Sequence, residues 1–187
     1  MAVHRKRVRF LNVPGHAHFW TCSCYQRLPL LSKDRSRMWF VDAVNRARAK
    51  HHFDVWAWVI MPEHVHVLLY PRQARYEMKD IVWSIKQPVG VNAIHWLRKY
   101  DPTYLQRLTV VTRTRTYRRF WQAGPGFDEN VDEPAALPGI VDYIHHNPER
   151  RGLVERAVDW EWSSAREHSG MGPGPIPIDH TIPMIHP

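Results

Sequence analysis

The apolar positions of the first sixty residues follow the two periods of regular secondary structure. Residues 16–26 (HAHFWTCSCYQ) are rich in strand-forming side chains and predict a first strand. Residues 31–52 carry apolar side chains at helical spacing, with basic residues between them, and predict a helix; these positions are Met38, Val41, Val44 and Ala47. Residues 53–61 (FDVWAWVIM) are apolar on both faces, as expected of an inner strand.

A second strand and a long helix follow. Pro62 and Glu63 interrupt the strand pattern and residues 64–71 resume it, which predicts a tight hairpin. Residues 78–100 predict a helix with one apolar face, formed by Ile81, Ile85, Val89, Ala93, Trp96 and Leu97. Pro88 lies inside this segment and lacks a backbone N–H, so we expect it to kink or split the helix.

Residues 108–187 contain a predicted strand, a loop, a short helix and a tail. Residues 108–122 (LTVVTRTRTYRRFWQ) alternate like a strand, and residues 123–139 read as a loop. Residues 140–152 predict a short helix that Asn-Pro and then Gly bring to an end. Residues 171–187 are rich in Pro and Gly and predict an irregular tail.

This order of elements, β-α-β-β-α-β with a further C-terminal helix, predicts an α+β fold. We expect a ferredoxin-like antiparallel sheet with helices packed on it. A chain of 187 residues can bury one sizeable core, so residues 1–170 are predicted to form a single domain, followed by the tail over residues 171–187.

Charge narrows the class of partner. The chain has 26 Lys and Arg against 18 Asp and Glu, a net charge of +8, and a pI near 9.8, which favours a polyanion, nucleic acid before membrane. The start carries basic residues without an apolar signal region, and no apolar run approaches the roughly 18 residues of a membrane span. We therefore expect a soluble, cytoplasmic protein without a membrane partner.

The two cysteines, Cys22 and Cys24, are two positions apart on a predicted strand. Their thiols would point to the same side, which does not suit a disulfide. His16 and His18 share that side, so a zinc site is an alternative, although the spacing matches no standard ligand pattern. Ordinary strand packing is the favoured interpretation.

The segment MPEHVHVLLYP, residues 61–71, is apolar almost throughout, yet it carries two histidines one residue apart. On a strand His64 and His66 project to one face, while Val65, Val67 and Leu69 project to the other and can fill a core. Neutral imidazoles that converge in this way form half of a divalent metal site. The alternative is a pair of hydrogen-bonded strand histidines with no ligand.

A second segment, DYIHHNP, offers a nucleophile and a further ligand. Tyr143 and Asn147 are four residues apart, so both fall on one helical face, where one could attack a substrate and the other contact a metal. The structural alternatives are a core tyrosine and an Asn-Pro helix stop.

Several blocks of the chain together resemble a known family. The blocks are WVIMPEHVHVLL, SIKQ, FWQ, IVDYIHHNPERRGLV and DWEWSS, and they extend over roughly residues 8–169 in the family's order. They resemble the single-tyrosine HUH transposases, specifically the REP-associated tyrosine transposases. Residues 1–170 would then form one HUH transposase-like domain with a C-terminal nucleophile helix.

The resemblance implies a set of roles. His64 and His66 would bind a divalent metal ion, Mg or Mn, Asn147 would supply the third ligand, and Tyr143 would be the nucleophile. The substrate would be single-stranded DNA folded as repetitive extragenic palindrome (REP) hairpins, cut and rejoined through a 5′-phosphotyrosine. The protein would act as a monomer or homodimer.

Basic residues provide candidate DNA contacts. The candidates are an N-terminal arm (Arg5, Lys6, Arg7 and Arg9), Lys86 in the SIKQ block, and a later group (Arg113, Arg115, Arg118 and Arg119). Tyr117, Phe120 and Trp121 are interleaved with the last group and could stack on bases. For each group of basic residues, the alternative is a solvated face that does not contact DNA. Two other functions stay open: a DNA-hairpin binding protein that does not cleave, and a metal-dependent phosphodiesterase in which water attacks.

Overall fold

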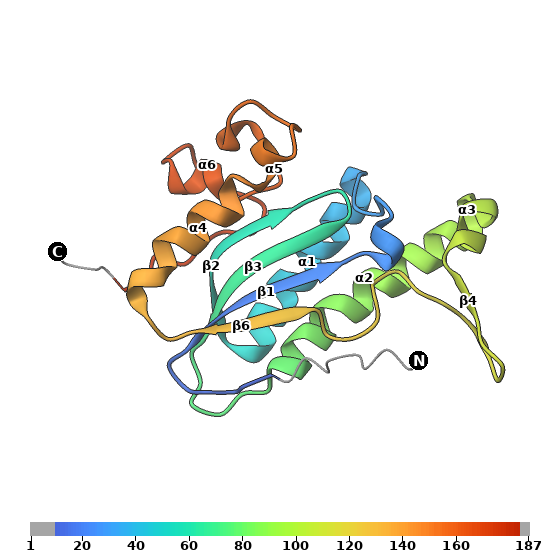
Figure 1. Cartoon of the computed structure of the whole chain (residues 1–187), viewed down its shortest axis with the longest axis horizontal. Helices are drawn as coiled ribbons and strands as arrows, with labels where there is room; N and C mark the ends of the chain where they lie inside the picture. The colour runs from blue at the N-terminus through green and yellow to red at the C-terminus, as the bar shows by residue number, and fades with distance from the viewer. Residues whose placement is uncertain (1–9, 184–187) are drawn as a thin grey trace, which may run out of the picture.

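The structure, a computed structural model, describes residues 10–183 and has a four-stranded antiparallel sheet at its centre (Figure 1). The strand order is β2-β3-β1-β6, and every neighbouring pair is antiparallel. One helix connects β1 to β2 and another follows β3, which gives the ferredoxin-like order and confirms the predicted α+β fold. The strands are β1 (Ala17–Ser23), β2 (Phe53–Ile60), β3 (His64–Pro71) and β6 (Phe127–Val131).

The sheet separates two layers of helices. Helices α1 (Asp34–His51) and α2 (Met78–Tyr100) lie side by side on one face, over a core that includes Val65, Val67 and Leu69 (Figure 1). Helix α4 (Leu137–His145) packs on the other face, against β2 and β3. The strand period therefore sends alternate side chains of β3 to the two layers.

Helix α2 runs without a break through Pro88, so the expected split is wrong. Ile85 and Val89, on either side of the proline, are fully buried in the core, and this packing holds both halves of the helix in place. In α1, the buried stripe contains Phe40, Val41, Val44 and Ala47, whereas Met38 is exposed. The helix ends at His51, and His52, which follows it, adopts a left-handed conformation.

The region after α2 differs from its predicted form. A short helix, α3 (Pro102–Arg107), is followed by a small hairpin of β4 (Thr109–Val111) and β5 (Thr116–Arg118), where a single strand was predicted. Thr112 and Arg115 close the turn. The Thr112 N–H and hydroxyl donate to the Arg115 carbonyl, and the Arg115 N–H donates to the Thr112 hydroxyl oxygen. The fourth strand of the sheet is β6, within the predicted loop, and it lies at the sheet edge beside β1.

The predicted nucleophile helix is two short helices. Helix α4 begins at Leu137, with Pro138 in its first turn where a proline is tolerated, and α5 (Asn147–Arg150) follows after a break at His146. A 3₁₀ turn, η3 (Ala157–Asp159), and a last short helix, α6 (Ala165–His168), complete the elements after α5.

Strand β2 lies at the edge of the sheet, so its predicted inner position is wrong. Both of its faces are nevertheless buried, because the segment after η3 covers this edge. The carbonyls of Trp162 and Trp58 accept backbone hydrogen bonds across this edge, and Asp179 pairs with Val55 through backbone and carboxylate. Residues 171–183 form no helix or strand, yet Ile176 is buried in the main core. Edges covered in this way are protected from pairing with other chains.

Within residues 10–183, no helix is both long enough and apolar enough to span a membrane.

Candidate active site

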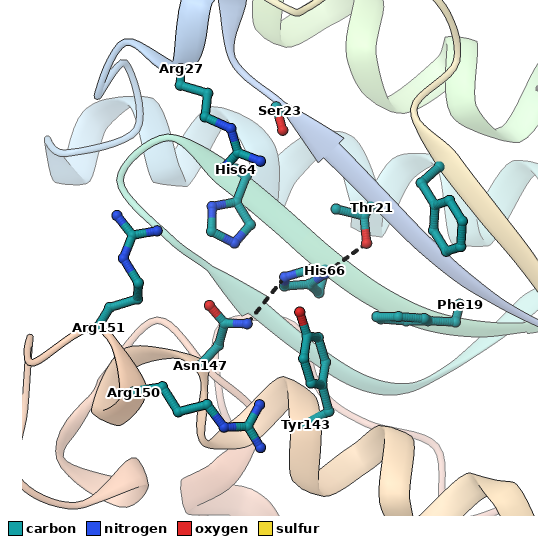
Figure 2. A pocket seen from close by; sticks show the side chains of 11 residues that line it. Phe19, Thr21, Ser23, Arg27, His64, His66, Tyr143, Asn147, Arg150 and Arg151 are labelled. Carbon is teal, nitrogen blue, oxygen red and sulfur yellow. Dashed lines mark hydrogen bonds between the residues drawn. The ribbon is translucent and has the colours of Figure 1, made fainter. Parts of the chain in front are cut away.

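A cavity of about 450 Å³ opens on the face of the sheet that carries α4. Strands β1 and β3 form its floor, and α4 and α5 form one wall (Figure 2). His64, His66, Tyr143 and Asn147 all line it, so the structure brings together the four residues predicted as metal ligands and nucleophile.

His64 and His66 occupy the cavity because of the strand period. Their neighbours Val65 and Val67 face the α1 and α2 layer, so the two imidazoles share the opposite face. Their ring centroids are 4.8 Å apart, and the two residues are 6% and 5% exposed. Two buried imidazoles at this distance would repel each other if both were protonated.

The hydrogen-bond partners determine which ring nitrogen of each histidine faces the cavity. His64 Nδ1 lies 3.2 Å from a Glu63 carboxylate oxygen, which can only accept, so Nδ1 carries the proton. His66 Nδ1 lies 2.7 Å from the Thr21 hydroxyl, and its Nε2 accepts from the Asn147 amide at 3.2 Å. In both rings the lone pair therefore lies on Nε2, the nitrogen that would bind a metal, and in His66 it accepts from the Asn147 amide.

Burial keeps both imidazoles neutral. Burial, together with the smaller effects of neighbouring His64 and of Arg27, lowers the pKa of His66 to about 3. Burial also lowers the pKa of His64, although Glu63 opposes the shift. At neutral pH, both side chains are thus in the form that can donate a lone pair to a cation.

Tyr143 enters the cavity from α4. Its ring centroid lies 5.4 Å from that of His66 in an edge-to-face contact, and Figure 2 shows its hydroxyl directed toward His66. The side chain is 42% exposed, which contradicts the alternative of a closed core tyrosine. Phe19 packs against both His66 and Tyr143 and so fixes their relative position.

Asn147 is buried at the start of α5, one turn after Tyr143. Its amide nitrogen is the donor to His66 Nε2. A half-turn of the amide group would present Oδ1 at the same point, because the two ends of an amide have nearly the same shape. Asn147 is therefore both a helix boundary, as its Asn-Pro sequence predicts, and a cavity residue.

Two imidazole nitrogens and one amide oxygen make a neutral, three-donor set that fits a divalent ion with positions left for substrate oxygens. Among the residues described, no group of three or more His, Cys, Asp or Glu side chains could hold a metal. The candidate set differs from such clusters because its third member is an amide.

Three arginines of the cavity were missed by sequence reasoning: Arg27, Arg150 and Arg151. The Arg150 guanidinium carbon lies 5.0 Å from the centroid of the Tyr143 ring, and Arg151 donates to Glu63 at 2.8 Å. For Arg150 and Arg151 the available signal was the Arg-Arg pair one residue after the Asn-Pro stop, and the helix turn brings Arg150 back beside Tyr143. Arginine is suited to phosphate oxygens because its planar fork donates two bonds.

The predicted DNA contacts lie elsewhere. Arg113 and Arg115 are exposed on the β4–β5 hairpin, Arg118 is exposed at its end, and Arg119 is half-buried. Lys86 on α2 donates to the Gly124 carbonyl at 2.6 Å. The arm residues Arg5, Lys6, Arg7 and Arg9 lie outside the described residues.

Base stacking is available to only one of the three predicted aromatics. Phe120 and Trp121 are buried, and the Trp121 indole N–H donates to the Lys86 carbonyl, so their proposed stacking on DNA is wrong. Tyr117 stays partly exposed between the guanidinium groups of Arg115 and Arg119.

The residues of the alternative zinc site do not form one. His18 is buried between Asp128, at 3.0 Å, and the Tyr76 hydroxyl, at 2.8 Å. Cys22 and Cys24 are free and buried in the core, where burial raises both thiol pKa values. Strand packing, the favoured interpretation, accounts for these residues.

Comparison with known proteins agrees with the sequence resemblance. No protein-family model matches the chain. The chain is 24% identical over 172 residues to a REP-associated tyrosine transposase of Escherichia coli (strain K12), covering 89% of this chain and 86% of the relative. A Haemophilus influenzae protein provisionally assigned to the same group is 23% identical over 142 residues, covering 72% and 76%.

The fold is shared with a solved structure of a REP-associated tyrosine transposase bound to a REP hairpin. The TM-score is 0.67 at 19% identity, and the match covers 99% of this chain and 95% of the other. The predicted resemblance to REP-associated tyrosine transposases is thus confirmed in sequence and in fold.

Proposed function

We propose that this protein is a metal-dependent single-strand DNA endonuclease and strand transferase that cleaves and rejoins DNA at palindromic hairpins through a 5′-phosphotyrosine. The observation that carries the proposal is the shared cavity of Tyr143, His64, His66 and Asn147. Similarity to proteins named as transposases, one of them bound to a REP hairpin, supports a DNA-processing role and a hairpin substrate.

His64 Nε2, His66 Nε2 and the Asn147 amide oxygen would hold the divalent ion, Mg or Mn. When bound, the ion would act as a Lewis acid toward a non-bridging phosphate oxygen. Glu63 keeps the His64 proton on Nδ1. In His66 the Asn147 donor places the lone pair on Nε2, and Nδ1–H then donates to the Thr21 hydroxyl.

Tyr143 would supply the nucleophile. Its oxygen forms a bond to phosphorus, the bond from phosphorus to the 3′ oxygen breaks, and the released strand end takes a proton to become a 3′-hydroxyl. The phenol proton passes to water. Attack by another 3′-hydroxyl on the phosphotyrosine reverses the sequence and rejoins strands without ATP, because the phosphodiester energy is kept in the covalent bond.

Guanidinium groups would position the DNA. Arg27, Arg150 and Arg151 line the cavity and place positive charge beside the attacked phosphate. Arg150 lies against the Tyr143 ring, so its guanidinium group is next to the side chain that would attack.

A second contact region would hold the hairpin. It consists of Lys86, Arg113, Arg115, Arg118 and Arg119, on α2 and the β4–β5 hairpin, with the arm residues Arg5, Lys6, Arg7 and Arg9 added. Exposed arginines on a projecting hairpin suit phosphate contacts along a folded strand.

A single assay tests this proposal against its alternatives. Labelled single strands that contain palindromes found beside the gene are incubated with protein and Mn²⁺ or Mg²⁺, then separated on native and on denaturing gels. We expect a slow complex, cleaved strand, and a denaturation-resistant protein-DNA band, with the last two lost in EDTA. Binding without cleavage would indicate a hairpin-binding protein, and cleavage without the covalent band would indicate attack by water.

A further inference from the structure

A buried carboxylate lies directly behind the candidate metal ligand His64. Glu63 belongs to the tight turn between β2 and β3 and is only 8% exposed. One of its oxygens, Oε1, accepts from both His64 Nδ1, at 3.2 Å, and Arg151 Nη1, at 2.8 Å. We infer that Glu63 and Arg151 form a positioning pair that orients His64 for metal binding, an inference that rests on the proposed function.

The chemistry of the carboxylate determines what it does to the imidazole. A carboxylate accepts hydrogen bonds and donates none, so it holds the His64 proton on Nδ1 and turns Nε2 toward the cavity. The Glu63 carbonyl also accepts from Cys24 N at 2.8 Å, which fixes this turn to the end of β1. The acceptor is therefore set in place by the backbone before any ligand arrives.

Arg151 contributes from the other wall of the cavity. It immediately follows α5, and its backbone N–H donates to the Asn147 carbonyl at 3.2 Å. Figure 2 shows its side chain reaching from the α5 side toward His64, which rises from β3. The ion pair thus connects α5, which carries Asn147, to the turn that precedes β3, which carries the two imidazoles.

Folding stability alone does not account for this arrangement. The Arg151 side chain is about half exposed, and an ion pair with one exposed partner adds little to stability. A buried carboxylate is unfavourable unless it is paired and hydrogen-bonded, and here both partners are cavity residues. The Glu63–Arg151 pair is thus placed to orient the His64 imidazole.

Loss of such a partner typically weakens metal binding by roughly 10- to 100-fold. We expect Glu63→Ala to weaken Mn²⁺ binding within that range. Glu63→Gln keeps an oxygen acceptor for His64 Nδ1 and should restore most of the affinity. Arg151→Ala should have a smaller effect, and no further effect when Glu63→Ala is already present, because the two act through one bond.

The experiment measures Mn²⁺ affinity of the full chain by titration calorimetry at pH 7.5, with thermal unfolding recorded for each variant. Arg156→Ala is the matched control, since it removes an ion pair with Asp159 on the exposed surface and should leave affinity unchanged. Folded Glu63→Ala and Arg151→Ala proteins that both bind within twofold of wild type would overturn the inference. If Glu63→Ala does not fold, Arg151→Ala decides the question, and an affinity within twofold of wild type in that variant would overturn the inference.

A second readout separates this inference from the proposed function. Nitrogen NMR of ¹⁵N-histidine-labelled protein, recorded in EDTA, reports which nitrogen of His64 carries the proton. We expect Nδ1–H in wild type and a shift toward Nε2–H in Glu63→Ala; Nε2–H in wild type would overturn the positioning pair. Wild-type Mn²⁺ affinity in His64→Ala, with Nδ1–H intact in wild type, would instead reject the metal site of the proposed function.

Discussion

The Thr21 hydroxyl lies 2.7 Å from Nδ1 of His66, and the two residues are direct partners in the β1–β3 pair. The hydrogen bond is thus a product of strand register, and it leaves His66 Nε2 facing the cavity. Thr21→Val keeps the shape of the side chain but removes the oxygen. We expect it to weaken Mn²⁺ binding by roughly tenfold, as for other partners of metal-binding histidines.

Titration calorimetry checks this prediction, with Thr21→Ser as the control that retains the hydroxyl and should bind nearly as wild type. Unfolding in urea should show a loss of only about 1 kcal/mol for Thr21→Val, the usual contribution of one hydrogen bond. Equal Mn²⁺ affinity in the Val and Ser variants would mean that Thr21 does not orient His66.

Acid should destabilise the protein through His66. Folding lowers the pKa of this imidazole from 6.5 to about 3 because it is buried, so only the unfolded state takes up its proton between these values. Stability therefore falls as pH falls through this window and is unaffected above it. At pH 5 the loss from this one group is about 2 kcal/mol.

Urea unfolding in EDTA at pH 7.5 and pH 5 measures the effect in wild type and His66→Gln. The variant has no imidazole at this position, so it should lose about 2 kcal/mol less than wild type between the two pH values. Identical losses would show that His66 is protonated in the folded protein.

Gly126 allows β6 to approach β1 beside the cavity. Its φ is +103°, and a Cβ at this position would lie 2.2 Å from the Thr21 carbonyl oxygen. Gly124 has a similar φ, +91°, with nothing within 4 Å, so Gly124→Ala reports backbone strain alone. That strain costs about 1–3 kcal/mol.

Thermal and urea unfolding should show a clearly larger loss for Gly126→Ala than for Gly124→Ala. Gly126→Ala should also lower Mn²⁺ affinity, because it displaces the backbone of the residue that orients His66. If the free energy of unfolding falls by the same amount in the two variants, the close approach of Gly126 to Thr21 does not contribute to stability.

Binding of single-stranded hairpin DNA should weaken steeply as salt is raised, because phosphate contacts release counterions. Replacing Arg113 and Arg115 with Ala should lower both the affinity and the salt slope, the slope by about one unit for each arginine replaced. Fluorescence anisotropy at several salt concentrations measures this, with exposed Arg46 on α1, replaced by Ala, as the control. An unchanged slope would assign the two arginines to a solvated face, and equal affinity for perfect duplex would contradict a hairpin substrate.

Periodicity predicted those parts of the fold in which one element buries one face. The alternation of His64, Val65, His66 and Val67 placed the imidazoles opposite the main core, and the helical stripe of α1 was correct except at Met38. The grouping of His64 and His66 with Tyr143 and Asn147 followed from the family resemblance of five short blocks, and within two of these blocks a strand and a helix turn fix side-chain direction locally.

The errors have a different physical origin. Strand β6 has three consecutive polar residues between Phe127 and Val131 and follows two glycines and a proline. Its local signal is therefore that of a loop, and only pairing with β1 makes it a strand. The edge position of β2 was hidden because residues far along the chain cover it. Arg27 reaches the cavity, and Glu63 reaches His64, from short turns whose side-chain directions depend on tertiary packing.

The central claim is that Tyr143 forms a bond to DNA. Wild-type protein, incubated with Mn²⁺ and a cleavable single strand, should yield a covalent adduct, and mass spectrometry of its proteolytic peptides should locate the phosphodeoxyribose group on Tyr143. Tyr143→Phe removes only the attacking oxygen, so it should bind the strand with wild-type affinity and form no adduct, whereas Tyr104→Phe should form it normally. Cleavage by Tyr143→Phe at the wild-type rate, or an adduct on Tyr104 or Tyr117, would contradict the account.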